Sequence, residues 1–207
     1  MPIDLILLSS GIHGREMAEI IRRTGKYNLF GIIRGAETQE KISPDGIPIL
    51  GGPSALSDYP DTALIHDNEF SRIYLDNPDI SKRLISLIDP ASFIHPSAVI
   101  GRGCVIYPNC FIGAEAVIGE SCFLLSGAVI NHNCVVGNRV VMATGAHLAG
   151  NVKIEDNVYI GQDASVRQFL CVGKNALIGM GAVVIKSVPE NAVMGGNPAK
   201  LIRMKEK

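Results

Sequence analysis

A six-residue repeat runs through the second half of the chain and constrains its fold more than any other feature. From Ile94 to Val184, every sixth residue is aliphatic or methionine, over sixteen hexads without an insertion. The fifth residue of each hexad, from Ala98 to Val188, is small or aliphatic. One large and one small inward position per repeat is typical of a parallel β-helix, in which every hexad supplies a short strand and a turn.

The period also sets the stacking in this predicted β-helix. Three hexads make one triangular coil, so residues 18 apart stack at the strand spacing of about 4.8 Å. Sixteen hexads give about five coils. Glycine and asparagine supply the tight turns at Gly101, Gly103, Asn109, Gly119, Gly137, Asn138 and Gly161. Four of the five cysteines lie on the small inward track, and we interpret them as buried hydrophobes: Cys104, Cys110, Cys122 and Cys134.

The composition argues against several function classes. Nineteen basic and 20 acidic residues give a net charge of −1, so no charge excess predicts binding to nucleic acid or to an anionic membrane. The chain has no run of about 18 apolar residues, and its start, MPIDLILLSS, lacks the basic segment and the cleavage site of a signal peptide. The five cysteines form no CxxC pair. These features predict a cytoplasmic protein.

The first half has the pattern of a small, Rossmann-like α/β domain. The apolar run IDLILL predicts a strand buried on both faces, and Met17, Ile20 and Ile21 lie at helical spacing after it. The loop SSGIHGR between them leads into the helix N-terminus, a natural place for a phosphate, although G-x-G-x-x-G is absent. Further predicted elements are strands at 28–35, 47–52 and 62–67 and a helix near 70–88.

Five motifs spread along the chain carry a resemblance to a known family. They are GIHGR at 11–15, PILG at 48–51, FIHPSAVIG at 93–101, AVINHNCVVG at 128–137 and GNPAK at 196–200. With them the chain resembles bacterial sugar acyltransferases of the NeuD/PglD type, within the hexapeptide-repeat acyltransferase superfamily. The resemblance implies a (nucleotide-)sugar-binding α/β domain over residues 1–90. It also implies a left-handed β-helix acyltransferase domain with a C-terminal tail over 91–207.

The same resemblance implies an activity and an assembly. The implied reaction transfers an acetyl group from acetyl-CoA to an amino or hydroxyl group of a sugar, nucleotide-linked or sialic-acid-like, in surface-glycan biosynthesis. The implied assembly is a homotrimer with active sites between neighbouring subunits.

The resemblance assigns the role of general base to His132, in the motif AVINHNCVVG. Acyl transfer needs a base for the proton of the acceptor and hydrogen-bond donors for the tetrahedral oxyanion. The family places Glu or Asp after the base, whereas this chain has Asn133. Stacking puts Glu115 one coil before Asn133, and we hypothesise that Glu115 supplies the missing carboxylate. Stacking also puts Gly150 one coil after His132, and the resemblance implies the Gly150 N–H as the oxyanion donor.

Acetyl-CoA binding is implied by the resemblance at Val141, Gly150, Gln162 and Met180. Val141 stands where the family can have a histidine, and His147 is a further candidate for the CoA groove. Basic residues near the C-terminus either meet the CoA phosphates or form a solvated tail: Lys186, Lys200, Arg203 and Lys205. A metal site of the carbonic-anhydrase type needs two histidines five residues apart, and because that spacing is absent we expect no metal.

The sugar site is predicted in the α/β domain, at Gly11, Ile12, His13, Arg34 and His66. The family binds uracil through two aspartates after the second strand, whereas this chain has Arg34 and Gly35 there. His66 replaces a glycine close to the nucleotide, and the loop SSGIHG has one glycine fewer than usual. A UDP-sugar is therefore not assumed. Sialic-acid-like, GDP-linked and dTDP-linked acceptors stay open, as does the choice between amine and hydroxyl.

A second class of function stays open beside the enzyme. It is a non-catalytic trimeric β-helix that serves as a scaffold or a ligand sensor. His132, Gly150 and the GNPAK tail favour the enzyme, and binding of acetyl-CoA discriminates between the two.

Overall fold

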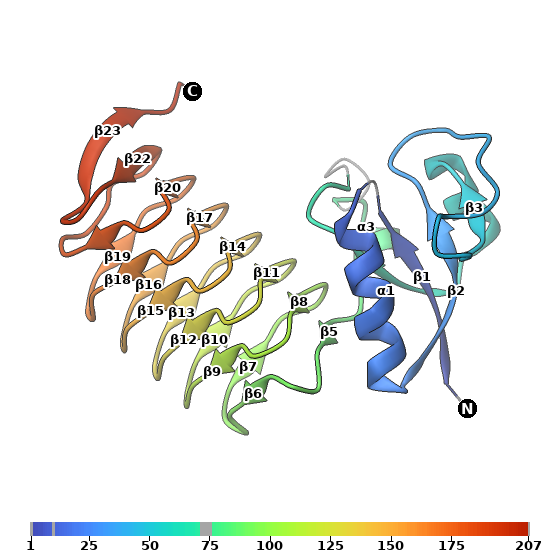
Figure 1. Cartoon of the computed structure of the whole chain (residues 1–207), viewed down its shortest axis with the longest axis horizontal. Coiled ribbons are helices and arrows are strands. Elements are labelled where there is room, and N and C mark those ends of the chain that lie inside the picture. The colour runs from blue at the N-terminus through green and yellow to red at the C-terminus, as the bar shows by residue number, and fades with distance from the viewer. Residues whose placement is uncertain (1, 10, 71–75, 207) are drawn as a thin grey trace. The chain divides into compact units, whose positions relative to one another are not determined.

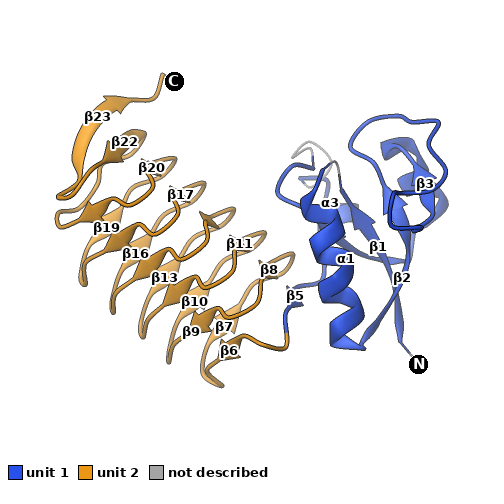
Figure 2. Ribbon diagram, in the orientation of Figure 1, with its two compact units in different colours: residues 1–89 blue, residues 90–207 orange. Residues whose placement is uncertain are grey.

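The structure is a computed structural model that describes residues 2–9, 11–70 and 76–206. The chain divides into two compact units, Met1–Asp89 and Pro90–Lys207, which have different colours in Figure 2. In the described ranges, no helix has the length and hydropathy that crossing a membrane requires.

The N-terminal unit is built on a four-stranded parallel sheet with the strand order β3-β2-β1-β4 (Figure 1). Its elements in chain order are β1 (Ile3–Leu8), α1 (His13–Thr24), β2 (Tyr27–Ile33), β3 (Ile49–Gly51), the 3-10 helix η1 (Pro53–Asp58), β4 (Ala63–His66), α3 (Pro78–Ser81) and β5 (Leu87–Ile88). Strand β1 pairs in parallel with β2 on one edge and with β4 on the other. This central position explains why the apolar residues from Leu5 to Leu8 are completely buried.

Both faces of this sheet are covered by apolar side chains. Helix α1 buries Met17, Ile20 and Ile21 and exposes its charged residues, as its sequence pattern predicts. Alternate residues of β1, Ile6 and Leu8, pack in a separate cluster with side chains from η1 and α3. The prediction of a small parallel α/β unit is therefore confirmed, whereas its assignment to a Rossmann-like fold stays a prediction.

The helix predicted near 70–88 is largely wrong. Helix α3 covers only Pro78–Ser81, β5 begins at Leu87, and residues 71–75 lie outside the described part of the chain. The chain leaves the helix because its backbone turns to β4: the Ile85 N–H donates to Leu64 O at 2.9 Å. The Arg83 guanidinium fastens this turn by donating to the carbonyls of Thr62 and Tyr59.

The second unit is a three-walled parallel β-helix (Figure 1). Its first wall contains β6 (Phe93–Ile94), β9 (Phe111–Ile112), β12 (Val129–Ile130), β15 (His147–Leu148), β18 (Ser165–Val166) and β21 (Val183–Val184). The second wall contains β7 (Val99–Ile100), β10 (Val117–Ile118), β13 (Val135–Val136), β16 (Lys153–Ile154) and β19 (Cys171–Val172). The third contains β8 (Val105–Ile106), β11 (Phe123–Leu124), β14 (Val141–Met142), β17 (Tyr159–Ile160), β20 (Leu177–Ile178), β22 (Ala192–Gly195) and the antiparallel β23 (Lys200–Met204).

Strands of neighbouring coils pair in parallel with a shift of 18 residues, as the repeat predicts. For example, Val117 pairs with Val135, and Val129 pairs with His147. On the large track, every side chain from Ile106 to Val184 is at most 2% exposed. The cysteines of the small track are also buried, which confirms their interpretation as interior residues.

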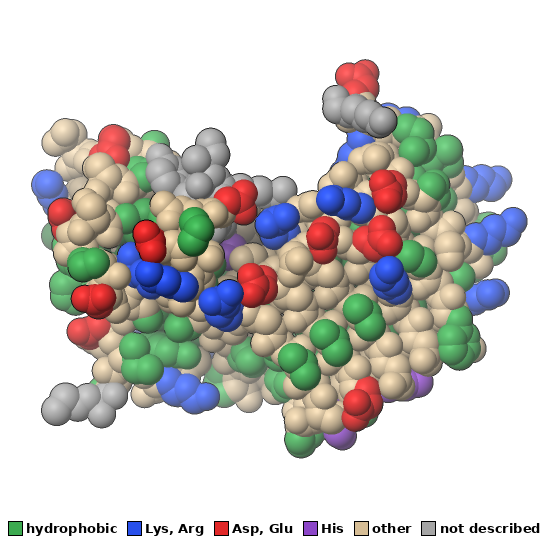
Figure 3. All heavy atoms as spheres, turned by 180° about the vertical axis from the view of Figure 1, so that it is seen from behind, with side chains coloured by type: hydrophobic (Ala, Val, Ile, Leu, Met, Phe, Trp, Pro, Cys, Tyr) green, Lys and Arg blue, Asp and Glu red, His purple; other side chains and the backbone are tan. Residues whose placement is uncertain are grey.

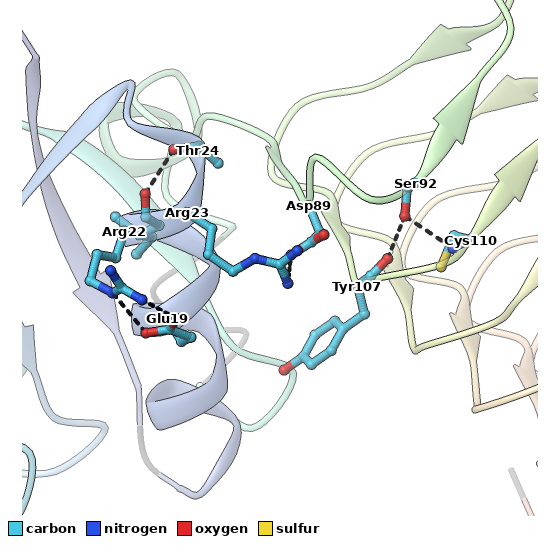
Figure 4. A network of polar contacts seen from close by, with 9 residues as sticks. Glu19, Arg22, Arg23, Thr24, Asp89, Ser92, Tyr107 and Cys110 are labelled. Atoms are coloured by element: carbon cyan, nitrogen blue, oxygen red, sulfur yellow. Dashed lines mark hydrogen bonds and ion pairs between the residues drawn. The ribbon is translucent and has the colours of Figure 1, made fainter.

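Polar contacts secure the end of the N-terminal unit and the start of the β-helix, each within its own unit (Figure 4). In the N-terminal unit, Arg23 at the end of α1 forms an ion pair of 2.8 Å with the buried carboxylate of Asp89. In the β-helix, the Ser92 hydroxyl donates to Tyr107 O at 2.6 Å and accepts from the Cys110 N–H at 3.0 Å. These bonds satisfy backbone groups in the first coil.

Candidate active site

His132 lies in the turn between β12 and β13, with its side chain exposed. Its Nδ1 is 2.9 Å from the side-chain oxygen Oδ1 of Asn133, the next residue. An amide oxygen only accepts hydrogen bonds, so in this contact Nδ1 carries the proton. The other ring nitrogen, Nε2, then holds a lone pair, which is the form that a general base needs.

The imidazole of His132 lies directly against Gly150 in the next coil. A Cβ atom on Gly150 would be 2.6 Å from both Nε2 and Cε1 of the ring. The Asn151 N–H donates to His132 O at 3.0 Å and joins the two turns. The predicted stacking of Gly150 on His132 is confirmed, and the absence of a side chain at 150 is what makes room for the ring.

The backbone N–H of Gly150 makes no hydrogen bond within the described part of the chain. At the equivalent turn position of another corner, the N–H of Glu120 donates to Asn138 Oδ1 at 2.8 Å. One coil later the Asn138 N–H donates in the same way to Asp156 Oδ1, also at 2.8 Å. Among the described residues, the Gly150 N–H has no such acceptor. A donor of this kind beside a base is the arrangement that stabilises an oxyanion.

Glu115 has the stacked position predicted for it, but it does not meet the imidazole. It lies one coil before Asn133 and shares the left-handed backbone of that residue, with φ of 58° against 59°. Its N–H donates to Ser97 Oγ at 2.9 Å, while its side chain is exposed. Within the described part of the chain, no hydrogen bond joins Glu115 to His132, whose Nδ1 is held by Asn133. The role of Glu115 therefore stays a prediction.

The residues predicted to bind acetyl-CoA lie away from the His132 turn, Gly150 excepted. Gln162 and Met180 follow β17 and β20 and stack on each other at the corner between the third and first walls, where the Gly181 N–H donates to Gln162 O at 2.7 Å. Met180 is 75% exposed. Val141 is half-buried on β14. Within one subunit, His132 and the pair Gln162 and Met180 thus occupy two different edges of the triangular prism.

The N-terminal unit contains a cavity of about 240 Å³ at the carboxyl ends of β1 and β2. It is lined by Ser9, Gly11, Ile12, Gly14, Arg15, Ile32, Arg34, Ser43, Pro44, Asp45 and Ile47. Three of the five predicted sugar-site residues, Gly11, Ile12 and Arg34, therefore line one cavity. His13 and His66 are not part of its lining. His13 begins α1 and contacts Glu16 at 3.4 Å.

Two arginines and the N-terminus of a helix line the cavity. Helix α1 begins at its wall with no side-chain cap, which puts the positive end of the helix dipole at the cavity. Arg34 contacts Glu40 at 3.0 Å, and Arg15 forms two bonds of 2.7 Å to Asp45 across the rim. The hydrogen bonds from Arg15 hold the pKa of the Asp45 carboxyl below its usual value.

His66 is buried at the end of β4. Its Nδ1 is 2.9 Å from Asp67 O, and its Nε2 has no hydrogen-bond partner in the described structure. Burial lowers the pKa of this imidazole, because a charged ring would be desolvated there. His66 therefore stays neutral near pH 7, and its role in the sugar site stays a prediction.

Sequence reasoning missed the rim of this cavity. Arg15 and Asp45 are 30 residues apart and belong to a helix and a loop, so no local pattern links them. Ser43 and Asp45 lie in a stretch to which the sequence assigned no element. Among the described residues, no group of three or more histidine, cysteine or acidic side chains has the arrangement of a metal site.

Known proteins match this chain in sequence over short segments and in structure over nearly its whole length. Residues 115–150 match the family model described as bacterial transferase hexapeptide (six repeats). A stretch of 32 residues is 56% identical to the putative acetyltransferase YJL218W of Saccharomyces cerevisiae. That stretch is 16% of this chain and 16% of the yeast protein, so the match is confined to a small part of both.

Two solved structures agree with the chain along nearly its whole length. The acetyltransferase domain of PglB from Neisseria gonorrhoeae FA1090, in complex with acetyl coenzyme A, has a TM-score of 0.86 at 28% identity, over 98% of this chain and 100% of that domain. PerB from Caulobacter crescentus, in complex with CoA and GDP-perosamine, has a TM-score of 0.86 at 23% identity, over 97% of each chain, which shows the shared fold. The repeat, the match over residues 115–150 and the whole-chain likeness show that this chain carries bacterial transferase hexapeptide repeats in a left-handed β-helix and is similar in fold to known acetyltransferases.

Proposed function

We propose that the protein is an acetyl-CoA-dependent acetyltransferase that acylates an amino or hydroxyl group of a sugar, bound as a nucleotide-linked or sialic-acid-like sugar. One observation carries the proposal: the His132 imidazole lies against Gly150, whose N–H has no acceptor among the described residues. A base and an oxyanion donor are thereby held side by side on one corner of the β-helix. Acyl transfer requires both groups at one reacting carbonyl.

The geometry suggests the order of proton and acyl transfer. Nε2 of His132 removes a proton from the acceptor amine or hydroxyl as that atom attacks the thioester carbonyl. The carbonyl oxygen becomes an oxyanion, and the Gly150 N–H donates to it. The tetrahedral intermediate then collapses: the carbon–sulfur bond breaks, the CoA thiolate leaves, and the imidazolium returns its proton to the sulfur. Throughout these steps the Asn133 side-chain oxygen accepts a hydrogen bond from the Nδ1–H of His132.

Asn133 makes this base weaker than one paired with a carboxylate. A carboxylate beside Nδ1 stabilises the imidazolium by charge, whereas an amide oxygen stabilises it only by its dipole. Orientation and tautomer are kept, because Asn133 Oδ1 accepts from Nδ1 at 2.9 Å. We therefore expect the reaction to keep its mechanism and to lose part of the driving force for proton removal.

The cavity of the N-terminal unit is the proposed site for the nucleotide part of the acceptor. Its helix N-terminus and Arg34 suit a phosphate or another anionic group. PerB is known in complex with GDP-perosamine, and PglB is an acetyltransferase domain, so an amino sugar on a nucleoside diphosphate is the acceptor class to test first. The enzyme would act in surface-glycan biosynthesis.

The separation of the predicted contacts supports the proposed homotrimer. His132 lies on one edge of the prism, and Gln162 and Met180 lie on another, so a site that uses both needs two copies of the chain. The β-helix face in Figure 3 exposes hydrophobic side chains, and the second wall, which begins next to the His132 turn, includes the exposed Val99, Val117 and Val135. Such a row on a flat wall favours burial against another subunit.

The test measures thiol release from acetyl-CoA with a panel of nucleotide-linked amino sugars and free sialic acids. We expect turnover with one acceptor in the wild-type protein and a loss of at least 100-fold in His132→Ala. His95→Ala is the matched control, because His95 is also a β-helix histidine, its ring contacts Ser97, and no role in the site is predicted for it. If no acceptor supports turnover and acetyl-CoA does not bind, the protein is instead a non-catalytic scaffold or sensor.

A further inference from the structure

We propose that Cys134 positions the oxyanion donor of this site. Its thiol donates to the Ala149 carbonyl oxygen, with 3.1 Å between Sγ and O. The Ala149 carbonyl and the Gly150 N–H belong to one peptide group. Cys134 is thus a positioning residue that acts through the backbone and touches no substrate. The inference rests on the proposed acetyl transfer and goes beyond it by adding a residue to its machinery.

The planarity of the peptide makes this connection direct. In a trans peptide the C=O and N–H bonds point in opposite directions and rotate together. Cys134 is completely buried, so the carbonyl that it contacts points into the β-helix. The Gly150 N–H therefore points outward, away from the interior of the β-helix. A hydrogen bond on the inner end of this peptide resists rotation of its outer end.

Two other interior cysteines, Cys104 and Cys122, make the same bond at peptides that are already held from outside. Cys122 donates to Gly137 O, and the distance is again 3.1 Å. In that peptide the N–H of Asn138 donates to Asp156 Oδ1 at 2.8 Å, so a side chain of the next coil fixes it independently. At Gly150 no described residue performs this task. Cys134 is therefore the side chain that holds the 149–150 peptide while its N–H is left for the acyl oxygen.

The thiol of Cys134 is protonated, as a hydrogen-bond donor must be. Burial raises the pKa of Cys134, so the sulfur keeps its proton at neutral pH and can donate to the carbonyl. A hydrogen bond accepted by a carbonyl also polarises the N–H of the same peptide, which strengthens the bond that this N–H donates. Both effects, orientation and polarisation, act on the transition state through Gly150.

Two substitutions separate this role from a role in packing. Cys134→Val removes the donor but fills the space, and valine already occupies the stacked position of the next coil, Val152, in the same buried track. Cys134→Ser keeps a donor but loses apolar contact. Packing alone predicts that valine is tolerated better than serine. The positioning role predicts the opposite order for kcat: serine, which keeps a donor, should be better tolerated than valine. Cys122→Val is the matched control, because it removes the same bond at a peptide held from outside.

The experiment measures kcat, the KM for acetyl-CoA and the melting temperature of the three variants, with the acceptor that supports wild-type turnover. We expect kcat to fall about 5- to 20-fold in Cys134→Val, below the 100-fold or greater loss of a deleted oxyanion donor. The KM for acetyl-CoA should be unchanged. Cys134→Ser should retain kcat in spite of a lower melting temperature, and Cys122→Val should retain kcat.

A spectroscopic measurement tests the same inference without an acceptor. The infrared carbonyl band of bound [1-¹³C]acetyl-CoA shifts to lower frequency when the carbonyl accepts a hydrogen bond, and this shift should shrink in Cys134→Val. Wild-type turnover with equal kcat and equal band position in Cys134→Val would overturn the role of Cys134 and leave the proposed function intact. Failure of the wild-type protein to bind acetyl-CoA would overturn both.

Discussion

Gly150→Ala tests the contact on which the proposed site depends. The added Cβ would lie 2.6 Å from Nε2 and Cε1 of His132. Non-bonded carbon contacts need about 3.5 Å, so the ring must move by roughly 0.9 Å. A displacement of about 1 Å between reacting groups costs about 100-fold in rate, or about 2.7 kcal/mol in the activation free energy. We expect kcat to fall by this factor.

The substitution should leave the fold intact. Gly150 is not among the glycines with positive φ, and alanine occupies the equivalent turn position two coils earlier, at Ala114. Replacement of glycine by alanine at a compatible backbone position typically raises the free energy of unfolding by about 0.4–1 kcal/mol. In a protein that also carries His132→Ala, no ring opposes the new methyl group. There Gly150→Ala should therefore leave the melting temperature unchanged or raise it slightly.

A double-mutant cycle with His132→Ala decides the cause of the loss. Kinetic measurements on the wild type, both single variants and the double variant give the coupling between the two positions. If alanine acts by displacing the imidazole, Gly150→Ala has no further effect on the residual rate of His132→Ala. Full activity in Gly150→Ala would refute the reasoning. An equal loss in both backgrounds would show that alanine obstructs acetyl-CoA rather than the base.

Three further substitutions test the surroundings of the site. Asn133→Asp puts a carboxylate beside Nδ1 of His132, which stabilises the protonated ring. The acidic limb of the kcat/KM profile should therefore move to higher pH, and an unmoved limb would contradict the Nδ1 contact. Burial lowers the pKa of His66 in the folded protein, so below about pH 6.5 the unfolded state binds more protons than the folded state. The free energy of unfolding therefore falls as the pH decreases through this range. His66→Gln should flatten this pH dependence, which urea titrations at several pH values measure. Arg34→Met should raise the KM for a nucleotide-linked acceptor about tenfold with kcat and the KM for acetyl-CoA unchanged, and equal KM values would remove Arg34 from the acceptor site.

The β-helix could be predicted in detail because its repeat is local and strictly periodic. Each hexad forms its own strand and turn, and an offset of 18 residues specifies which residues become neighbours. The position of Gly150 next to His132 followed from this offset alone. The burial of the cysteines followed in the same way, since the fifth residue of each hexad points inward.

Side-chain direction at the turns did not follow from the period. Glu115 and Asn133 have nearly the same φ, yet only the Asn133 side chain meets Nδ1 of His132. The offset places Cα atoms, whereas a turn side chain still chooses among rotamers according to its local partners. The unengaged N–H of Gly150 was likewise invisible, because it depends on which side chain of the next coil reaches it.

The N-terminal unit shows the other limit. Its buried central strand and the helix after it could be read from apolar patterning, as Leu5 and Met17 illustrate, because burial of one strand or one helix face leaves a local periodic trace. Its cavity could not be predicted from the sequence, because Arg15 and Asp45 are 30 residues apart and meet only in the folded chain. The order of residues thus specifies the repeat, its register and the neighbourhood of His132, since these depend on local period. Packing in three dimensions alone decides which donors stay unengaged and which charges face the cavity, since these depend on contacts between segments distant in sequence.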